Sequence, residues 1–161
     1  MRHLAYLALG SNLEDPAAQV RNAMNALDAL PHTRVLKCSS LYRSAPVGYL
    51  DQPDFINAVV QVATGLAPHA LLDAMLALEQ ACGRTREFAN APRTLDLDLL
   101  LYEALVLHEH GLTLPHPQMH RRAFVLQPLL EIAPDCVIPG VGPAAVVAKA
   151  CAEQQLVRLD S

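Results

Sequence analysis

The segment RTLDLDLLLY, residues 93 to 102, places two aspartates inside a leucine-rich run. In a β-strand alternate side chains point to opposite faces, so Asp96 and Asp98 would share one face and the intervening leucines the other. Two carboxylates this close repel each other unless a cation lies between them, and a divalent metal bound through oxygen is the natural candidate. The alternative is an edge strand whose aspartates face solvent, although aspartate is a poor strand former and needs a compensating reason there.

The length and composition of the chain fit a single globular domain covering residues 1 to 161. Hydrophobic residues make up 52% and charged residues 17%, and the uncharged apolar runs fall short of the roughly 20 residues that a membrane span requires. We therefore expect a soluble protein without a membrane partner. The first twelve residues lack a signal-peptide cleavage site and the four cysteines form no CxxC pair, so we expect buried thiols, a cytoplasmic location and, by default, a monomer.

The charge pattern argues against a nucleic acid partner and for a local phosphate site. The formal net charge is -4, whereas nucleic acid binding usually needs a positive field. Arginines nevertheless cluster in two short segments, 84 to 93 and 121 to 122. Arginine presents a rigid fork that suits phosphate oxygens, so this clustering favours a phosphate site; general arginine usage would explain the abundance of arginine but not its clustering.

Periodicity and breakers predict an α+β fold. We expect strands at 4–9, 33–43 and 55–64, the aspartate strand itself, and helices at 16–30 and 68–81. This order is the ferredoxin-like βαββαβ arrangement, an antiparallel sheet with helices packed on one face and the aspartate strand in the centre. A C-terminal α/β extension follows, with a strand near 105–107, a helix at 123–132 and an amphipathic piece around 144–152.

The loops beside the aspartate strand point to a nucleotide polyphosphate. The segment 83–93 is polar, and if the aspartate face looks into a cleft we expect this segment to deliver its arginines to the rim. The sequence holds no GxxxxGK[ST] motif and no GxGxxG after the first strand, so phosphates would be bound by side chains and metal instead of a glycine-rich loop. The long segment 44–54, rich in Pro, Gly, Asp and Ser, has the length that usually carries function.

Five motifs are spread across nearly the whole chain: GSN at 10–12, YRSAPVG at 42–48, DQPDFINA at 51–58, PRTLDLDLL at 92–100 and PHPQMHRRAFVLQPLLEIAP at 115–134. Together and in this order they resemble the 6-hydroxymethyl-7,8-dihydropterin pyrophosphokinases of folate biosynthesis. The resemblance implies transfer of pyrophosphate from the co-substrate ATP to the pterin hydroxymethyl group, with release of AMP. It also implies two Mg²⁺ ions held by Asp96 and Asp98.

The resemblance further implies a role for individual residues. Arg84 and Arg93 match the catalytic arginines that clamp the transferred group. Positions that match the family's ATP-binding residues are Glu79, Arg84, Arg93, Leu99, Thr113, His116 and Arg122. Positions that match its pterin-binding residues are Ser44, Val47, Phe55, Asn57 and Phe124.

These assignments have simpler alternatives. A phenylalanine is usually a core residue, Asn57 could tie down a neighbouring loop, and Glu79 could be an ordinary solvated helix residue. The pairs His108/His110 and His116/His120 could suggest a transition metal, but neither has a convincing third ligand nearby. A magnesium-dependent nucleotidyltransferase would use the same carboxylates and release pyrophosphate, and a ligand sensor would bind ATP without turnover. An RNA-recognition domain of this shape needs exposed strand aromatics and a basic surface.

The chain also departs from the family's pattern. The segment 84–93 is one residue shorter than in familiar members, and the chain has no tryptophan, although one in that loop commonly covers the active site. Phe88 is a candidate for part of that purpose. Glu87 stands where a lysine is often found, and Pro117 where an aromatic residue is common, so closure of the site is where this chain is expected to differ.

Overall fold

The computed structural model describes residues 2–12, 15–45, 54–82 and 95–159. Ten strands, four α-helices and two short 3-10 helices lie within these ranges. The strands are β1 (His3–Ser11), β2 (Thr33–Cys38), β3 (Tyr42–Ser44), β4 (Phe55–Thr64), β5 (Asp96–Tyr102), β6 (Leu107–Glu109), β7 (Leu112–Leu114), β8 (Val137–Ile138), β9 (Gly142–Pro143) and β10 (Leu156–Arg158). The helices are α1 (Pro16–Asp28), α2 (Pro68–Ala81), η1 (Met119–Arg121), α3 (Ala123–Ile132), α4 (Ala144–Val147) and η2 (Ala148–Cys151).

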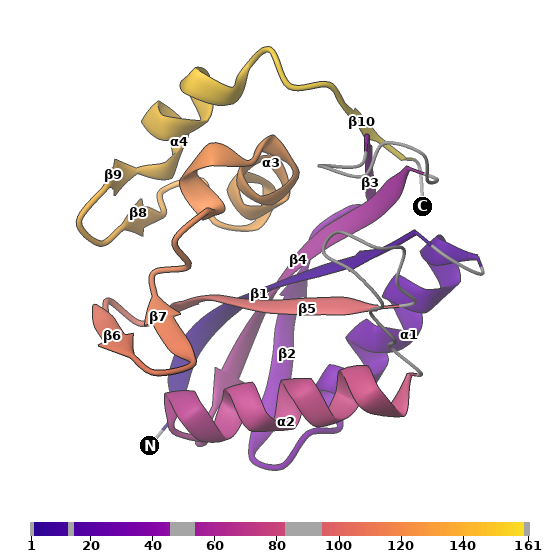
Figure 1. The fold of residues 1–161 in the computed structure, drawn as a ribbon, viewed down its shortest axis with the longest axis vertical. Helices are drawn as coiled ribbons and strands as arrows, with labels where there is room; N and C mark the ends of the chain where they lie inside the picture. The colour runs from indigo at the N-terminus through magenta and orange to yellow at the C-terminus, as the bar shows by residue number, and fades with distance from the viewer. Residues whose placement is uncertain (1, 13–14, 46–53, 83–94, 160–161) are drawn as a thin grey trace.

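A six-stranded antiparallel sheet forms the centre of the fold (Figure 1). Its strands follow the order β10-β3-β4-β1-β5, and β2 also pairs with β4, alongside the half of β4 that β3 leaves open. The expected mixed α/β architecture with an antiparallel sheet is therefore present. The expectation of a central aspartate strand is wrong: among the described strands, β5 pairs with β1 alone and lies at the edge of the sheet.

Helices α1 and α2 cover one face of the sheet, and their boundaries follow from the sequence. Each begins with a proline at its first turn, Pro16 and Pro68, where the missing N–H costs nothing. The buried residues of α1 are Val20, Ala23 and Leu27, one helical stripe facing the sheet. They pack with the leucines of β1 and β5 in one continuous core.

The opposite face of the sheet is covered by α3 and the C-terminal extension, so the helices do not all lie on one face as the sequence predicted. Figure 1 shows α3 and α4 on the far side of the strands from α1 and α2. A second core joins Val59, Leu100 and Leu101 of the sheet to Leu126 and Leu129 of α3. The helix predicted at 123–132 has the same bounds as α3.

Two local features of the sheet were not expected. The predicted strand 33–43 is broken into β2 and β3, because residues 39–41 leave the strand: Ser39 bonds to Val59, and Ser40 to the Glu131 carboxylate on α3. The pairing of β1 with β5 also shifts register between Tyr6 and Leu7, which marks a bulge. The bulge keeps both Leu99 and Leu101 buried, one on each face of the sheet.

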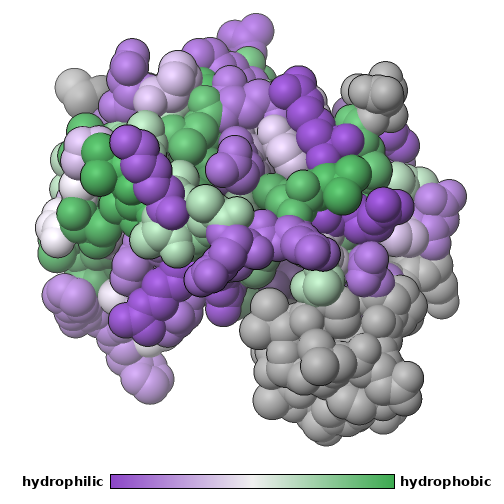
Figure 2. All heavy atoms as spheres, turned by 90° about the horizontal axis from the view of Figure 1, so that it is seen from above, coloured by the Kyte–Doolittle hydropathy of each residue, from purple (hydrophilic) through white to green (hydrophobic). Residues whose placement is uncertain are grey.

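The surface and the cysteines complete the description of the fold. All four cysteines are free, but Cys151 alone is buried and Cys38 is exposed, so the expectation of buried thiols holds for one of them. Figure 2, seen from above the C-terminal extension, shows apolar areas separated by polar side chains. No helix within the described residues is both long and apolar enough to cross a bilayer.

Candidate functional site

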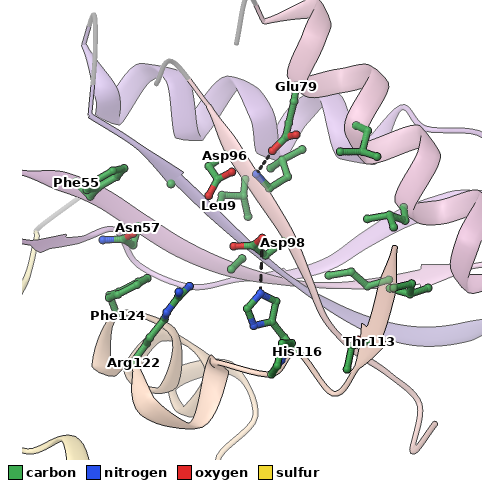
Figure 3. Close-up of a pocket in the computed structure, with 18 of the residues that line it drawn as sticks. Leu9, Phe55, Asn57, Glu79, Asp96, Asp98, Thr113, His116, Arg122 and Phe124 are labelled. Atoms are coloured by element: carbon green, nitrogen blue, oxygen red, sulfur yellow. Dashed lines mark hydrogen bonds and ion pairs between the residues drawn. The ribbon is translucent and has the colours of Figure 1, made fainter. Parts of the chain in front are cut away.

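A cavity of about 620 Å³ lies against the sheet face that α3 covers and reaches past the edge strand β5 to α2. Strands β1, β4 and β5 form its floor, α3 and the segment before it one wall, and α2 with the β6–β7 hairpin the other end. In Figure 3, Phe55, Asn57 and Phe124 lie at one end and Thr113 at the other, with the aspartates and His116 between them. The cavity therefore collects side chains from segments that are far apart in the sequence.

Asp96 and Asp98 are on the floor of this cavity, where the alternation of β5 places them. Both are half-buried and line the cavity, whereas Leu95, Leu97 and Leu99 belong to the core beneath α1 and α2. The prediction that the leucines and the aspartates lie on opposite faces is confirmed. Of the alternative, the edge position of the strand is found, whereas the two half-buried aspartates line a cavity. Across β1 the two aspartates stand opposite Gly10 and Ala8, whose small size leaves room above the strands.

The donor set of the acidic pair fits a hard cation. Magnesium is commonly bound through one or two carboxylates, with the remaining ligands supplied by water and substrate phosphates. Two half-buried carboxylates facing a cavity meet that requirement without a third acidic ligand. Among the described residues, no three His, Cys, Asp or Glu side chains are grouped to hold a metal ion, so the histidine pairs noted in the sequence form no such site there.

His116 stands beside the acidic pair and is held in one orientation. Its backbone N–H donates to the Leu100 carbonyl of β5 over 2.9 Å, and its Nδ1 accepts a hydrogen bond from the backbone N–H of Gln118 over 3.1 Å. Because Nδ1 is an acceptor, the neutral ring carries its proton on Nε2, which lies 3.8 Å from Asp98 Oδ1. Burial lowers the pKa of His116 and the Arg122 charge lowers it further, while Asp96 opposes both.

Arg122 and Phe124 flank the first residue of α3 and face the cavity. The Arg122 guanidinium carbon lies 5.5 Å from the centroid of the Phe124 ring, within cation–π range. Gln154, from the C-terminal segment, fixes the backbone around Arg122: its Oε1 accepts from the Ala123 N–H over 2.9 Å and its Nε2 donates to the Arg121 carbonyl over 2.8 Å. Gln154 was not among the predicted residues, because its contacts with Ala123 and Arg121 span 31 and 33 residues and leave no local pattern.

The aromatic end of the cavity contains a buried amide with a defined orientation. The Asn57 Nδ2 donates to the Ser44 hydroxyl over 2.6 Å, so the Asn57 Oδ1 is turned toward Gly10. Asn57 and Ser44 are both buried, and Phe55 is half-buried beside them. Gly10 was part of a quoted motif but had no predicted role; a methyl group there would stand 3.3 Å from the Asn57 Oδ1 and 3.9 Å from the Phe55 ring.

The remaining predicted binding residues either line the cavity at its α2 and hairpin end or lie outside the described residues. Leu99, Thr113 and Glu79 all line the cavity. Glu79 is buried, with 3% of its surface exposed, so the alternative of a solvated helix residue is wrong. Arg84, Arg93 and Val47 lie outside the described residues, as do Glu87 and Phe88.

Comparisons with known proteins agree on one family. The family model for 7,8-dihydro-6-hydroxymethylpterin-pyrophosphokinase matches residues 6–134. The 2-amino-4-hydroxy-6-hydroxymethyldihydropteridine pyrophosphokinase of Haemophilus influenzae is 42% identical over 156 residues, covering 97% of this chain and 98% of that protein. The enzyme of the same name from Pseudomonas aeruginosa is 45% identical over 154 residues, covering 96% of this chain and 95% of that protein.

The fold is also similar to that of a longer protein of known structure. Wild-type Plasmodium falciparum HPPK-DHPS, solved with pterin and p-hydroxybenzoate, superposes with a TM-score of 0.71 over 92% of this chain, at 15% sequence identity. This chain spans 43% of the length of that one. At this identity the likeness concerns the fold alone.

Proposed function

The chain belongs to the 7,8-dihydro-6-hydroxymethylpterin-pyrophosphokinase family, and from that membership we propose that it transfers pyrophosphate from ATP to the hydroxymethyl group of 6-hydroxymethyl-7,8-dihydropterin. AMP is the second product. The reaction is a step of folate biosynthesis.

One observation carries this proposal: a single cavity joins a carboxylate pair to an aromatic and amide end and to a hairpin end. The aromatic end, with Phe55, Asn57 and Phe124, suits a flat heterocycle that carries hydrogen-bonding edges. The hairpin end, with Leu99 and Thr113, suits the nucleoside of ATP. The acidic pair between them then lies where the phosphates join the two substrates.

The residues between the two ends would bind the triphosphate. Asp96 and Asp98 would hold two Mg²⁺ ions, which when bound supply charge neutralisation to the phosphate oxygens. Arg122 contributes a permanent positive charge from the wall of the cavity, and His116 presents its Nε2 proton toward the same space. Arg84 and Arg93 complete the set on the family resemblance, with the role of clamping the transferred group.

The transfer itself exchanges one phosphorus–oxygen bond for another. The pterin hydroxyl oxygen attacks the β-phosphorus, the bond from that phosphorus to the α–β bridging oxygen breaks, and AMP leaves with the bonding electron pair. The hydroxyl proton passes to solvent or to a phosphate oxygen. Such transfers need little deprotonation before attack, so orienting the hydroxyl and neutralising charge account for most of the acceleration.

The test is the release of AMP from MgATP with and without the pterin. We expect AMP only when the pterin is present. Asp96→Asn and Asp98→Asn keep the shape of the side chain and remove its charge, and each should lower turnover about 100-fold or more, because losing several kcal/mol of charge stabilisation corresponds to that factor. Circular dichroism spectra of both variants should match the wild type.

Two outcomes would contradict the proposal. Release of pyrophosphate instead of AMP would assign a nucleotidyltransferase, and normal turnover by either variant would overturn the role of the acidic pair.

We also assign the core strands to the ferredoxin-like class, because β1, β4 and β5 with the paired β2 and β3 follow that strand order. A cytoplasmic monomer stays our proposal for the whole chain, and light scattering on the purified protein tests the monomer.

A further inference from the structure

Glu79 occupies a position on α2 that should be apolar. The buried residues of this helix are Leu71, Met75 and Glu79, spaced four residues apart along one stripe. Leu71 and Met75 pack into the core, and Glu79 continues the same stripe with a carboxylate that is 3% exposed. A buried carboxylate is costly unless it is hydrogen-bonded, so its partner in the fold is informative.

One partner of Glu79 is the backbone of β5. The Leu97 N–H donates to Glu79 Oε2 over 2.6 Å, shorter than an ordinary N–H to oxygen hydrogen bond and typical of a charged acceptor (Figure 3). The bond exists because β5 lies at the edge of the sheet. Leu97 is opposite Leu9 of β1, but its N–H points away from β1. It donates to the Glu79 carboxylate, where a further strand would otherwise supply the acceptor.

Leu97 is the residue between the two aspartates. Its N–H belongs to the peptide plane that begins at Asp96, and its own Cα leads directly to Asp98. Fixing that N–H therefore fixes the direction in which both carboxylates leave the strand. Without it, the next described bond away from β1 is the one from the His116 N–H to the Leu100 carbonyl, so the stretch 96–98 would twist more freely and the two carboxylates would change their separation.

We propose that Glu79 is a positioning residue: through the Leu97 N–H it holds Asp96 and Asp98 at the separation that a divalent cation requires. This inference rests on the proposed function, which makes those aspartates the cation ligands. It differs from the role that the family resemblance implies for Glu79, a direct contact with the nucleotide. Groups that orient metal ligands typically alter metal affinity or activity 10- to 100-fold when they are removed.

The experiment measures cation binding separately from turnover. Mn²⁺ is titrated into the protein with α,β-methylene ATP, which cannot be cleaved between the α- and β-phosphates. AMP release is measured in parallel with MgATP and pterin. Three variants are compared: Glu79→Gln keeps an acceptor oxygen without charge, Glu79→Ala removes the acceptor, and Glu79→Leu removes it while filling the space. Met75→Ala removes volume from the same helix and core and serves as the control.

The expected result is that Glu79→Ala and Glu79→Leu bind Mn²⁺ at least about tenfold more weakly and lose turnover in proportion. Glu79→Gln should stay within about threefold of the wild type, because it restores the hydrogen bond, and Met75→Ala should lower the melting temperature but leave Mn²⁺ affinity unchanged. Amide hydrogen exchange at Leu97 should be faster in the alanine and leucine variants alone.

Several results would overturn the inference. Wild-type Mn²⁺ affinity in a folded Glu79→Leu or Glu79→Ala protein would do so, and so would equal losses in the glutamine and leucine variants, which would assign the effect to charge or to ligand contact. If neither the alanine nor the leucine variant folds, Glu79→Gln provides the test. A tenfold loss of Mn²⁺ affinity in that variant contradicts the positioning role, and wild-type affinity supports it. Failure of wild-type AMP release would instead count against the proposed function, since the Mn²⁺ titration does not depend on turnover.

Discussion

Replacing Gly10 with alanine should weaken pterin use while leaving ATP use intact. The added methyl group would stand 3.3 Å from the Asn57 Oδ1, which is too close for an ordinary contact, so the amide must move by a few tenths of an ångström. That movement strains the 2.6 Å hydrogen bond from Asn57 to the Ser44 hydroxyl. The other two contacts, 3.9 Å to the Ile56 carbonyl oxygen and 3.9 Å to the Phe55 ring, are ordinary and require no shift.

The size of the effect follows from the hydrogen bond that is put at risk. A neutral hydrogen bond contributes about 0.5–1.5 kcal/mol net, and each 1.36 kcal/mol is a factor of ten. We therefore expect kcat/KM for the pterin to fall about 2- to 13-fold, with KM for ATP within about twofold of the wild type.

Steady-state AMP release with each substrate varied in turn measures both quantities. Gly65→Ala is the matched control, because its methyl group would meet the His32 Cβ at 3.4 Å, away from the cavity. Unchanged pterin kinetics in Gly10→Ala would refute the reasoning that Gly10 makes room for Asn57. Equal losses for pterin and ATP would refute it as well, since they would indicate a general disturbance of β1.

Three further predictions concern the frame around the cavity. Burial raises the pKa of Glu131, but hydrogen bonds from Tyr42 and Ser40 outweigh it, so the folded pKa lies below the ordinary 4.5. The resulting stabilisation is complete above pH 4.5 and is lost as the pH falls through the folded pKa. Melting curves of the wild type and Glu131→Gln should therefore converge in acid. Gln154→Ala should raise KM for ATP about 2- to 10-fold by loosening the backbone on either side of Arg122, whereas the same change at the exposed Gln155 should not, and equal KM values in the two would contradict the role of Gln154. Leu7→Ala should cost about 2–5 kcal/mol in urea unfolding because Leu7 is fully buried, and a loss below 1 kcal/mol would contradict that core.

The sequence predicted those parts of the fold that local pattern controls. Helix α2 is predicted well because a proline at its first turn and an apolar stripe mark it within one segment. The bounds predicted for α3 also match, although Pro128 lies inside that helix. The break between β2 and β3 depends on the bond from Ser40 to Glu131, 91 residues away, so no local pattern could reveal it. The edge position of β5 depends on which strands pair, which alternation alone does not specify.

The candidate site divides in the same way. Alternation in the sequence was enough to put Asp96 and Asp98 on one face, and motif resemblance was enough to bring His116, Arg122 and the aromatic end together. The burial of Glu79 was accessible from its spacing relative to Leu71 and Met75, although the sequence interpretation treated a solvated position as an open alternative. Gly10 leaves room for the Asn57 side chain, and Gln154 bonds to backbone groups more than 30 positions earlier in the chain. Neither relation can be read from the local sequence.

The register of β5 against β1 has a consequence for how the chain reaches its active form. A slip of β5 by one residue would turn its leucines into the cavity and bury its aspartates beneath α1 and α2. Activity therefore requires the native register between β5 and β1. A misaligned strand would lose its packing and its catalysis in the same step. We therefore expect refolded preparations to contain fully competent and inert molecules in varying proportion, with a constant specific turnover per competent molecule.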